Sequence, residues 1–288
     1  MIAQTATKLK GFTPQLKQVL SRPFLSPVSP FRLQGPAAED GDRFTVYFTQ
    51  SRRDILRAQR LRFRIFSDEY GAQIKAPFGL DRDRFDKHCL HLLVRDNDTG
   101  ELVGYTRILT QERIAKTGGF YSAGEFDLGN LARLPGRVAE VGRTCIHKDY
   151  RSGAAISLLW AKIVQFALEE GIDYLIGCAS LALGDDYDCQ AICDTVRDKH
   201  LSEDSLRVMP RVPVPAGMLR AGGSTRMPPL LKAYLRLGAD ICGEPCWDAE
   251  FNCLDFLVLM PLERLPARYL QHFTQPRSGR GERLSRAI

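Results

Sequence analysis

Hydrophobic and polar residues alternate in "RFTVYFTQ" (residues 43–50), a pattern typical of a strand with one buried face. The next segment, "SRRDILRAQRLRFRIFSDEYG", has apolar residues at helical spacing and predicts a helix that ends at Gly71. In "HCLHLLVRDNDTGELVGYTRIL", two apolar runs flank the stretch from Asp96 to Gly100, which predicts a hairpin. The folded region therefore begins with a strand, a helix and a hairpin.

The rest of the chain continues to alternate strands and helices. The predicted elements are the strand "RVAEVGRTCIH", a helix at 152–170 closed by Gly171, the strand "DYLIGCASL", a helix near 187–200, a loop at 208–229, the helix "PLLKAYLRLGA" and the strands "ICGEPCWD" and "LDFLVLM". This order predicts an α+β fold in which helices cover both faces of a central mixed, twisted β-sheet.

The two ends of the chain differ in composition from this region. Residues 1–42 form a basic N-terminal extension with apolar positions at helical spacing, which either packs on the core or anchors the protein to a membrane surface. Residues 43–265 are predicted to form one domain, and residues 266–288, rich in Arg, Gly and Ser, a basic and mobile tail. No apolar run is long enough to cross a membrane.

Charge and cysteine spacing exclude several classes of protein. The net charge of +6 favours acidic partners such as phosphates, anionic lipids or an acidic carrier protein, but it is too small to indicate nucleic acid. The eight cysteines include no CxxC pair, so we expect reduced thiols in a cytoplasmic protein. His88 and His91 point to opposite faces of their predicted strand, so we expect no metal site, and nothing indicates a cofactor.

Glu140 stands between Val138 and Val141 in an otherwise apolar strand, where a carboxylate indicates a cleft or a partner. Arg143 would face the opposite side of a regular strand. A bulge near Gly142 would bring both side chains to one side, and bulges are frequent at active sites. The alternative is a solvated Glu and Arg at a sheet edge.

The start of the helix at 152–170 is also unusual. Ser152 is predicted as its cap, and Gly153, Ala154 and Ala155 form a first turn without bulky side chains. Free backbone N–H groups there, preceded by Arg151, would bind an anionic phosphate. Alternatively, the small residues let the helix pack closely on a strand.

These features together resemble the GNAT acyltransferase superfamily, although "RSGAAI" departs from its usual Q/R-x-x-G-x-G/A signature. Several blocks resemble the bacterial ornithine lipid N-acyltransferases, whose members are sometimes labelled putative hemolysins, and more distantly the acyl-homoserine-lactone synthases. The blocks are "RLRFRIFSDEYG", "LDRDRFDKHCLHLLV", "VGYTRIL", "EVGRTCIHKDYRSGAAISLLW", "YLIGCASL" and "LLKAYLRLGADICGEPCWDAEFNCLDFLVLMPLER".

The resemblance implies a set of functional residues. Glu140 and Arg143 would be catalytic. The substrate-binding residues would come from Arg62 or Arg64, of which we select Arg64, and from Asp83, Asp86 and Arg107. The residues that bind the phosphopantetheine arm of the acyl donor would be Thr144, Cys145, Ile146, Arg151, Ser152, Gly153, Ala154 and Ala155.

The implied reaction transfers a 3-hydroxy fatty acyl group from acyl carrier protein to the α-amine of L-ornithine and gives lyso-ornithine lipid. Attack on a thioester needs a neutral amine, so Glu140 is predicted to accept a proton as general base, and a backbone N–H beside the bulge to stabilise the oxyanion. The rival mechanism is covalent and uses the Cys145 thiol with His147 as its base.

The acceptor's carboxylate would meet Arg107 or Arg143, and its side-chain cation Asp83 or Asp86, unless these aspartates belong to a structural ion-pair network. The loop at 208–229 is basic and partly apolar and would dock the acidic carrier protein, contact the membrane, or remain a plain surface loop. Three other functions stay open: a lactone-forming signal synthase, a CoA-dependent GNAT acyltransferase or acetyltransferase, and a non-enzymatic membrane-binding protein.

Overall fold

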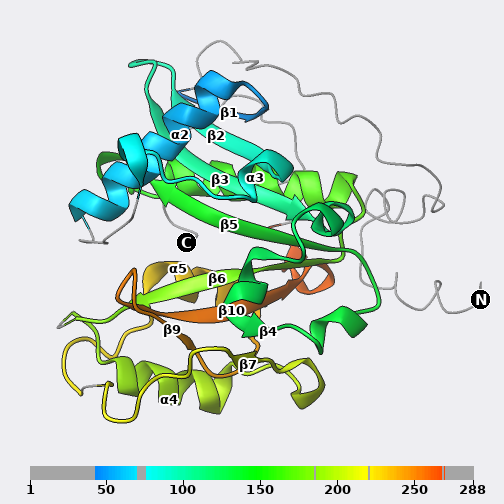
Figure 1. The fold of residues 1–288 in the computed structure, drawn as a ribbon, viewed down its shortest axis with the longest axis vertical. Coiled ribbons are helices and arrows are strands. Elements are labelled where there is room, and N and C mark those ends of the chain that lie inside the picture. The colour runs from blue at the N-terminus through cyan, green and yellow to red at the C-terminus, as the bar shows by residue number, and fades with distance from the viewer. Residues whose placement is uncertain (1–42, 70–75, 185, 220, 268, 270–288) are drawn as a thin grey trace, which may run out of the picture.

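The computed structural model describes residues 43–69, 76–184, 186–219, 221–267 and 269 (Figure 1). The helices are α2 (Arg52–Arg64), α3 (Ala154–Glu169), α4 (Cys189–Lys199) and α5 (Pro229–Arg236). The strands are β1 (Phe44–Thr49), β2 (Leu90–Asp96), β3 (Leu102–Thr110), β4 (Phe126–Asp127), β5 (Val138–Ile146), β6 (Tyr174–Ala182), β7 (Met209–Pro210), β8 (Asp240–Ile241), β9 (Cys246–Asp248) and β10 (Cys253–Pro261).

The main sheet has the strand order β1-β2-β3-β5-β6-β10-β8, and β9 also pairs with β10. All neighbouring strands are antiparallel except β5 and β6, which run parallel, so the sheet is mixed as predicted. A second, two-stranded sheet joins β4 to β7. The parallel step is possible because α3 connects β5 to β6 across one face of the sheet.

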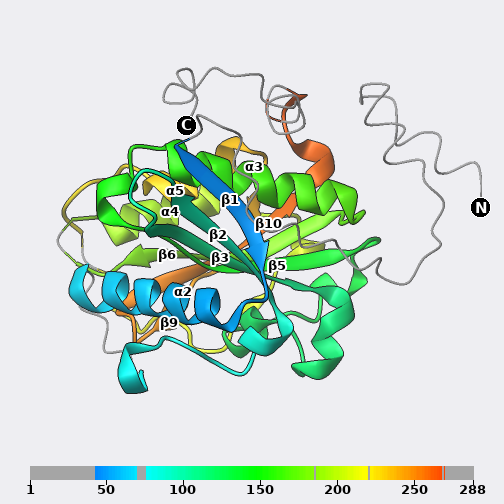
Figure 2. The ribbon, with the colours of Figure 1, turned by 90° about the horizontal axis from the view of Figure 1, so that it is seen from above.

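Helices cover both faces of the sheet, which confirms the predicted α+β architecture (Figure 2). One face packs against α3, α4 and α5 and contains the largest apolar core, including Leu159, Ile192 and Leu231. The other face packs against α2 through a smaller cluster that includes Leu61 and Tyr105. Because side chains alternate along a strand, each of the central strands contributes to both layers.

Local turn chemistry explains where several elements end. The hairpin turns where predicted: the Gly100 N–H donates to the Asp96 carbonyl at 2.9 Å, and Gly100 has a φ of +72°. The first helix passes from α2 into a π-helical turn, Ile65–Glu69. Its predicted end at Gly71 lies outside the described residues, as do the N-terminal extension and nearly all of the tail.

Helix α3 begins two residues later than predicted. Its N-cap is Gly153 with a φ of +105°, and no side chain caps it, so the prediction of Ser152 as the cap is wrong. A left-handed conformation favours glycine because it has no Cβ, and this decides which residue precedes the first turn. At the other end of the domain, Tyr269 packs into the main core, so folded structure continues past the predicted boundary at 265.

The two parallel strands pair over a short stretch only. Val138–Glu140 of β5 pairs with Tyr174–Ile176 of β6, although each strand continues for six further residues. Just beyond the last pair, a Cβ on Gly177 would lie 2.3 Å from the Val141 carbonyl oxygen, so only glycine permits this close approach. The strands then separate and leave a fork in the middle of the sheet.

No helix among the described residues has the length and apolar content needed to cross a membrane.

Candidate active site

A cavity of about 560 Å³ occupies the fork between β5 and β6. Residues 141–146 of β5 line one side and Cys178, Ser180 and Ala182 of β6 the other. Polar residues reach it from four strands on the face covered by α2, because alternation points every second side chain of a strand to that face. They include Arg107 on β3, Glu140 on β5, Ser180 on β6 and Asp255 on β10.

The predicted bulge in β5 is present, centred on Arg143 and not on Gly142. Tyr105 pairs with Cys145 and Arg107 with Gly142, so β5 has one residue more than β3 between these pairs. Arg143 takes up this extra residue with a φ of +56°. The buried Thr106 side chain donates to the Gly142 carbonyl at 3.1 Å and stabilises the bulge. Glu140 and Arg143 therefore both line the cavity.

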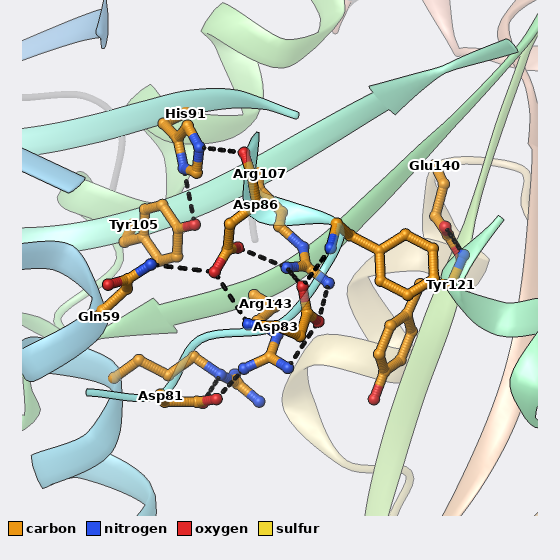
Figure 3. Close-up of polar contacts among 12 residues, drawn as sticks. Gln59, Asp81, Asp83, Asp86, His91, Tyr105, Arg107, Tyr121, Glu140 and Arg143 are labelled. Carbon is orange, nitrogen blue, oxygen red and sulfur yellow. Dashed lines mark hydrogen bonds and ion pairs between the residues drawn. The ribbon is translucent and has the colours of Figure 1, made fainter. Parts of the chain in front are cut away.

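Arg107 lies at the centre of an ion-pair cluster (Figure 3). Its guanidinium donates to both carboxylate oxygens of Asp83 at 2.7 Å and to Asp86 at 2.6 Å. Gln59 donates to the second oxygen of Asp86 at 3.0 Å. Burial by itself would raise the pKa of Asp83, but the hydrogen bonds and charge of Arg107, with the charge of Arg143, lower it to about 2.

Arg143 and Arg62 extend this cluster toward α2. Arg143 donates to Asp83 at 2.9 Å and also to Asp81, which accepts from the Arg62 Nε at 2.5 Å. The Arg62 guanidinium lies 4.1 Å from the centre of the Phe66 ring. Three arginines and three aspartates thus balance in charge, as a largely buried network requires.

This network changes two of the predicted assignments. Asp83 and Asp86 are engaged by Arg107 and do not line the cavity, as the structural ion-pair alternative requires. Arg64 is exposed and does not line the cavity, so Arg62 takes the place that we assigned to Arg64. The two arginines are two residues apart, about 200° around a helix, so they face opposite ways.

Glu140 is buried, and backbone groups hold its carboxylate. The Tyr121 N–H donates to one oxygen at 2.5 Å and the Ser122 N–H to the other at 2.8 Å. Burial raises the pKa of Glu140, although these hydrogen bonds oppose the shift. The carboxylate fixes the 3-10 turn Tyr121–Gly124, whose Tyr121 ring lies 5.5 Å from the Arg107 guanidinium and 5.8 Å from that of Arg143.

The residues predicted to bind the acyl donor divide into two groups. Thr144, Cys145, Ile146 and Arg151 line the cavity, whereas Ser152, Gly153, Ala154 and Ala155 do not. The side chain of Ala155 is fully buried in the main core, so the close-packing alternative describes it. The first turn of α3 begins at Ala154, three residues after Arg151, and Ile156 in that turn also lines the cavity.

Cys145, His147 and His91 each have contacts outside the cavity. Cys145 packs in the apolar cluster under α2, and the His147 ring contacts Tyr150 and accepts from the Asp149 N–H. Both ring nitrogens of His91 are engaged, one by the Tyr105 hydroxyl and one by the Asp86 carbonyl, each at 2.9 Å. All eight cysteines are free thiols.

Sequence reasoning missed three carboxylates at the cavity: Glu125, Asp248 and Asp255. Asp255 is buried in β10 opposite Ser180, whose hydroxyl donates to it at 2.5 Å. The sequence could have indicated Asp255, because it is the single charged residue in the apolar run "LDFLVLMPL", as Glu140 is in its own apolar stretch. Ligand atoms of Asp248, Cys253 and Asp255 lie within 4.8 Å of one another, a spacing that a metal site also shows.

Comparison with known proteins agrees with this fold. Residues 61–161 match the family model of the acetyltransferase (GNAT) domain. These residues contain the last turn of α2, the three arginines and three aspartates of the ion-pair cluster, Glu140, the bulge and the start of α3. The protein is therefore an acyltransferase of the GNAT class, as its sequence blocks predict.

Two relatives identify the family within that class. The chain is 35% identical over 250 residues to the L-ornithine N(alpha)-acyltransferase of Brucella abortus, which covers 79% of this chain and 88% of that protein. It is 34% identical over 245 residues to the L-ornithine N(alpha)-acyltransferase of Rhizobium meliloti, with 78% and 82% covered. The chain belongs to the L-ornithine N(alpha)-acyltransferase family, which confirms the resemblance noted in its sequence.

Among solved structures, the CoA-dependent acyl-homoserine lactone synthase BjaI is similar, with 16% identity and a TM-score of 0.48 over 77% of this chain and 81% of that chain. FeeM, an N-acyl amino acid synthase from uncultured soil microbes, has 15% identity and a TM-score of 0.46 over 76% and 91%.

Proposed function

We propose that this enzyme transfers a 3-hydroxy fatty acyl group from acyl carrier protein to the α-amine of L-ornithine and so forms lyso-ornithine lipid. Family membership supports the acceptor and the position of acylation, since the named relatives are L-ornithine N(alpha)-acyltransferases. The observation that carries the proposal is the cavity in the β5–β6 fork, which is lined by the bulge, by Arg151 and by several carboxylates.

The donor would enter along β5. The paired stretch of β5 and β6 ends at Glu140 and Ile176, so beyond it the two facing strand edges flank the cavity. A phosphopantetheine arm is extended and contains amide groups, which suit such edges, and its phosphate would meet Arg151 and the first turn of α3. The thioester would then lie near the bulge at Arg143.

The chemical step would be direct attack of the amine on the thioester carbonyl. Glu140 would accept a proton from the α-ammonium group, directly or through a water, because each carboxylate oxygen uses one lone pair for Tyr121 or Ser122 and keeps another. A backbone N–H at the bulge would stabilise the oxyanion. Collapse of the intermediate breaks the C–S bond, and the thiolate leaving group takes up the second amine proton.

The carrier protein would dock at the mouth of the cavity beside the loop at 208–229. This loop leads directly to Pro228, Pro229 and Leu230, which line the cavity, and Leu230 is 38% exposed. An acidic carrier suits its basic residues. The same loop exposes 72% of Met209, and contact with the cytoplasmic face of a membrane, which would receive the lipid product, is the second use that we propose for it.

The test is to incubate the purified protein with 3-hydroxyacyl carrier protein and a panel of amino acids, and to look for N-acylated products by mass spectrometry. We expect a product with L-ornithine. Reactions with the matching acyl-CoA and with the non-hydroxylated carrier thioester define the donor. If the folded protein acylates no amino acid from any of these donors, the proposal is wrong.

A further inference from the structure

Glu125, Asp248 and Asp255 all line the cavity and form its acidic wall. None of the three forms an ion pair with a described residue, in contrast to the aspartates around Arg107. Asp255 accepts from the Ser180 hydroxyl at one oxygen and from the Cys253 thiol at the other, and Asp248 accepts at one oxygen from the N–H groups of residues 250 and 251. None of these donors carries a positive charge, so no described cation pairs with the acidic wall.

Glu125 is the least satisfied member of the acidic wall. It directly follows the 3-10 turn Tyr121–Gly124, which the Glu140 carboxylate holds in place. Its Oε2 atom is buried and has no hydrogen-bond partner among the described residues. A buried carboxylate oxygen without a donor is unfavourable, and a cation that enters the cavity would relieve it.

The electrostatics of the acidic wall agree with this geometry. Burial and the charge of Asp255 raise the pKa of Glu125 to about 8. Burial and the charge of Asp248 raise the pKa of Asp255 to about 6, although the Ser180 hydrogen bond opposes the shift. Both groups therefore resist ionisation while the cavity lacks a cation, and a bound cation would lower both pKa values.

We propose that Asp255 and Glu125 bind the side-chain ammonium group of the acceptor amino acid and so select a cationic acceptor over a neutral one. This inference rests on the proposed function, because it concerns the acceptor of that reaction. It moves the cation site from Asp83 and Asp86, which Arg107 already engages, to two carboxylates that face the cavity.

An ammonium ion fits the acidic wall better than a metal ion. Cys253 has the nearest thiol, which already donates to the second oxygen of Asp255 at 3.8 Å, so a metal ion would have to displace this hydrogen bond and its proton. One oxygen of Asp255 is already occupied by the Ser180 hydroxyl. An alkylammonium group needs only two or three acceptor oxygens, which Asp255 and Glu125 supply together.

The experiment compares L-ornithine with L-norvaline, which has the same carbon chain without the terminal ammonium group. We expect the wild-type enzyme to prefer ornithine in kcat/KM. Asp255→Asn is expected to lower this preference by roughly 10- to 100-fold, the size of one lost charge-assisted contact, mainly through the KM for ornithine. Glu125→Gln is expected to act in the same direction and serves if the first variant does not fold.

Asp240→Asn is the matched control, because Asp240 is a half-buried aspartate on neighbouring β8, pairs with Arg264 at 2.5 Å and does not line the cavity. It should keep the wild-type preference. If the wild type uses both amino acids equally, or the variants lower both rates equally, the inference is wrong and the proposed function stands. If a chelator lowers the rates with ornithine and norvaline equally, and a divalent ion restores them, the acidic wall binds a metal ion and the inference is also wrong. If no amino acid is acylated, both proposals fail.

Discussion

Replacing Glu140 by glutamine separates its two possible roles, proton acceptor and anchor of the turn at 121–124. The change keeps the shape of the side chain but replaces one carboxylate oxygen with an NH₂ group. Since both oxygens accept from backbone N–H groups, one of the Tyr121 and Ser122 donors then faces another donor. Glu140→Gln should therefore affect stability as well as chemistry.

The expected magnitudes differ for the two roles. A hydrogen bond to a charged acceptor contributes about 1.5–3 kcal/mol, and the remaining bond becomes a weaker neutral one, so we expect the free energy of unfolding to fall by about 2–4 kcal/mol. Loss of a general base lowers kcat by roughly 10²- to 10⁴-fold. A variant that only loosened the turn would change the KM for the amine more than kcat.

The assay measures kcat and KM for L-ornithine against pH, with circular dichroism melts to find a temperature at which both proteins are folded. Burial raises the pKa of Glu140, so activity of the wild type should fall as the pH falls through a value above the ordinary range of a glutamate. This acidic limb should be absent in Glu140→Gln. A folded variant with nearly wild-type kcat and an unchanged acidic limb would show that Glu140 anchors the turn and is not the base.

Three further substitutions test other parts of the structure. Asp83→Asn should be less stable than the wild type above about pH 4. Because the pKa of Asp83 in the folded wild type is lowered to about 2, the difference in the free energy of unfolding, measured with urea, should shrink as the pH falls toward that value. A constant difference would contradict the ion-pair assignment. Gly177→Ala should lower the melting temperature and the activity, because the new Cβ meets the Val141 carbonyl; we expect a loss of about 1–3 kcal/mol in the free energy of unfolding. Gly184→Ala is the control and should change neither, because no atom lies within 4 Å of a Cβ at that position. Cys145→Ala should retain acyl transfer in the same assay, and its complete loss from a folded variant would favour the covalent route.

The local pattern of apolar, polar and turn residues was sufficient to predict most of the secondary structure. Strands β1 to β3, the hairpin turn at Gly100 and helix α4 lie where alternation, helical spacing and turn residues predict them. The errors are small and have backbone causes, such as the left-handed Gly153 that caps α3 in place of Ser152. The position of Glu140 at a cavity was also predictable, because a charge in an apolar strand has a desolvation cost wherever the strand lies.

The partners of the charged residues were not visible in the sequence. Choosing Arg64 over Arg62 was wrong because the direction of a helix face depends on how α2 packs against the sheet. Which aspartates Arg107 engages depended on β3 pairing with β2. Which carboxylates remain at the cavity depended on β10 pairing with β6, which is far away in the chain.

The sequence by itself determined the elements of this protein, the family to which it belongs and the isolated charge of Glu140, because these depend on local spacing and on blocks of neighbouring residues. Only the tertiary structure decided that β5 and β6 separate at Gly177, that Arg143 forms the bulge and that Asp255 and Glu125 share one cavity wall. Electrostatic energy depends on distance in space, and residues 125 and 255 become neighbours only when the sheet assembles.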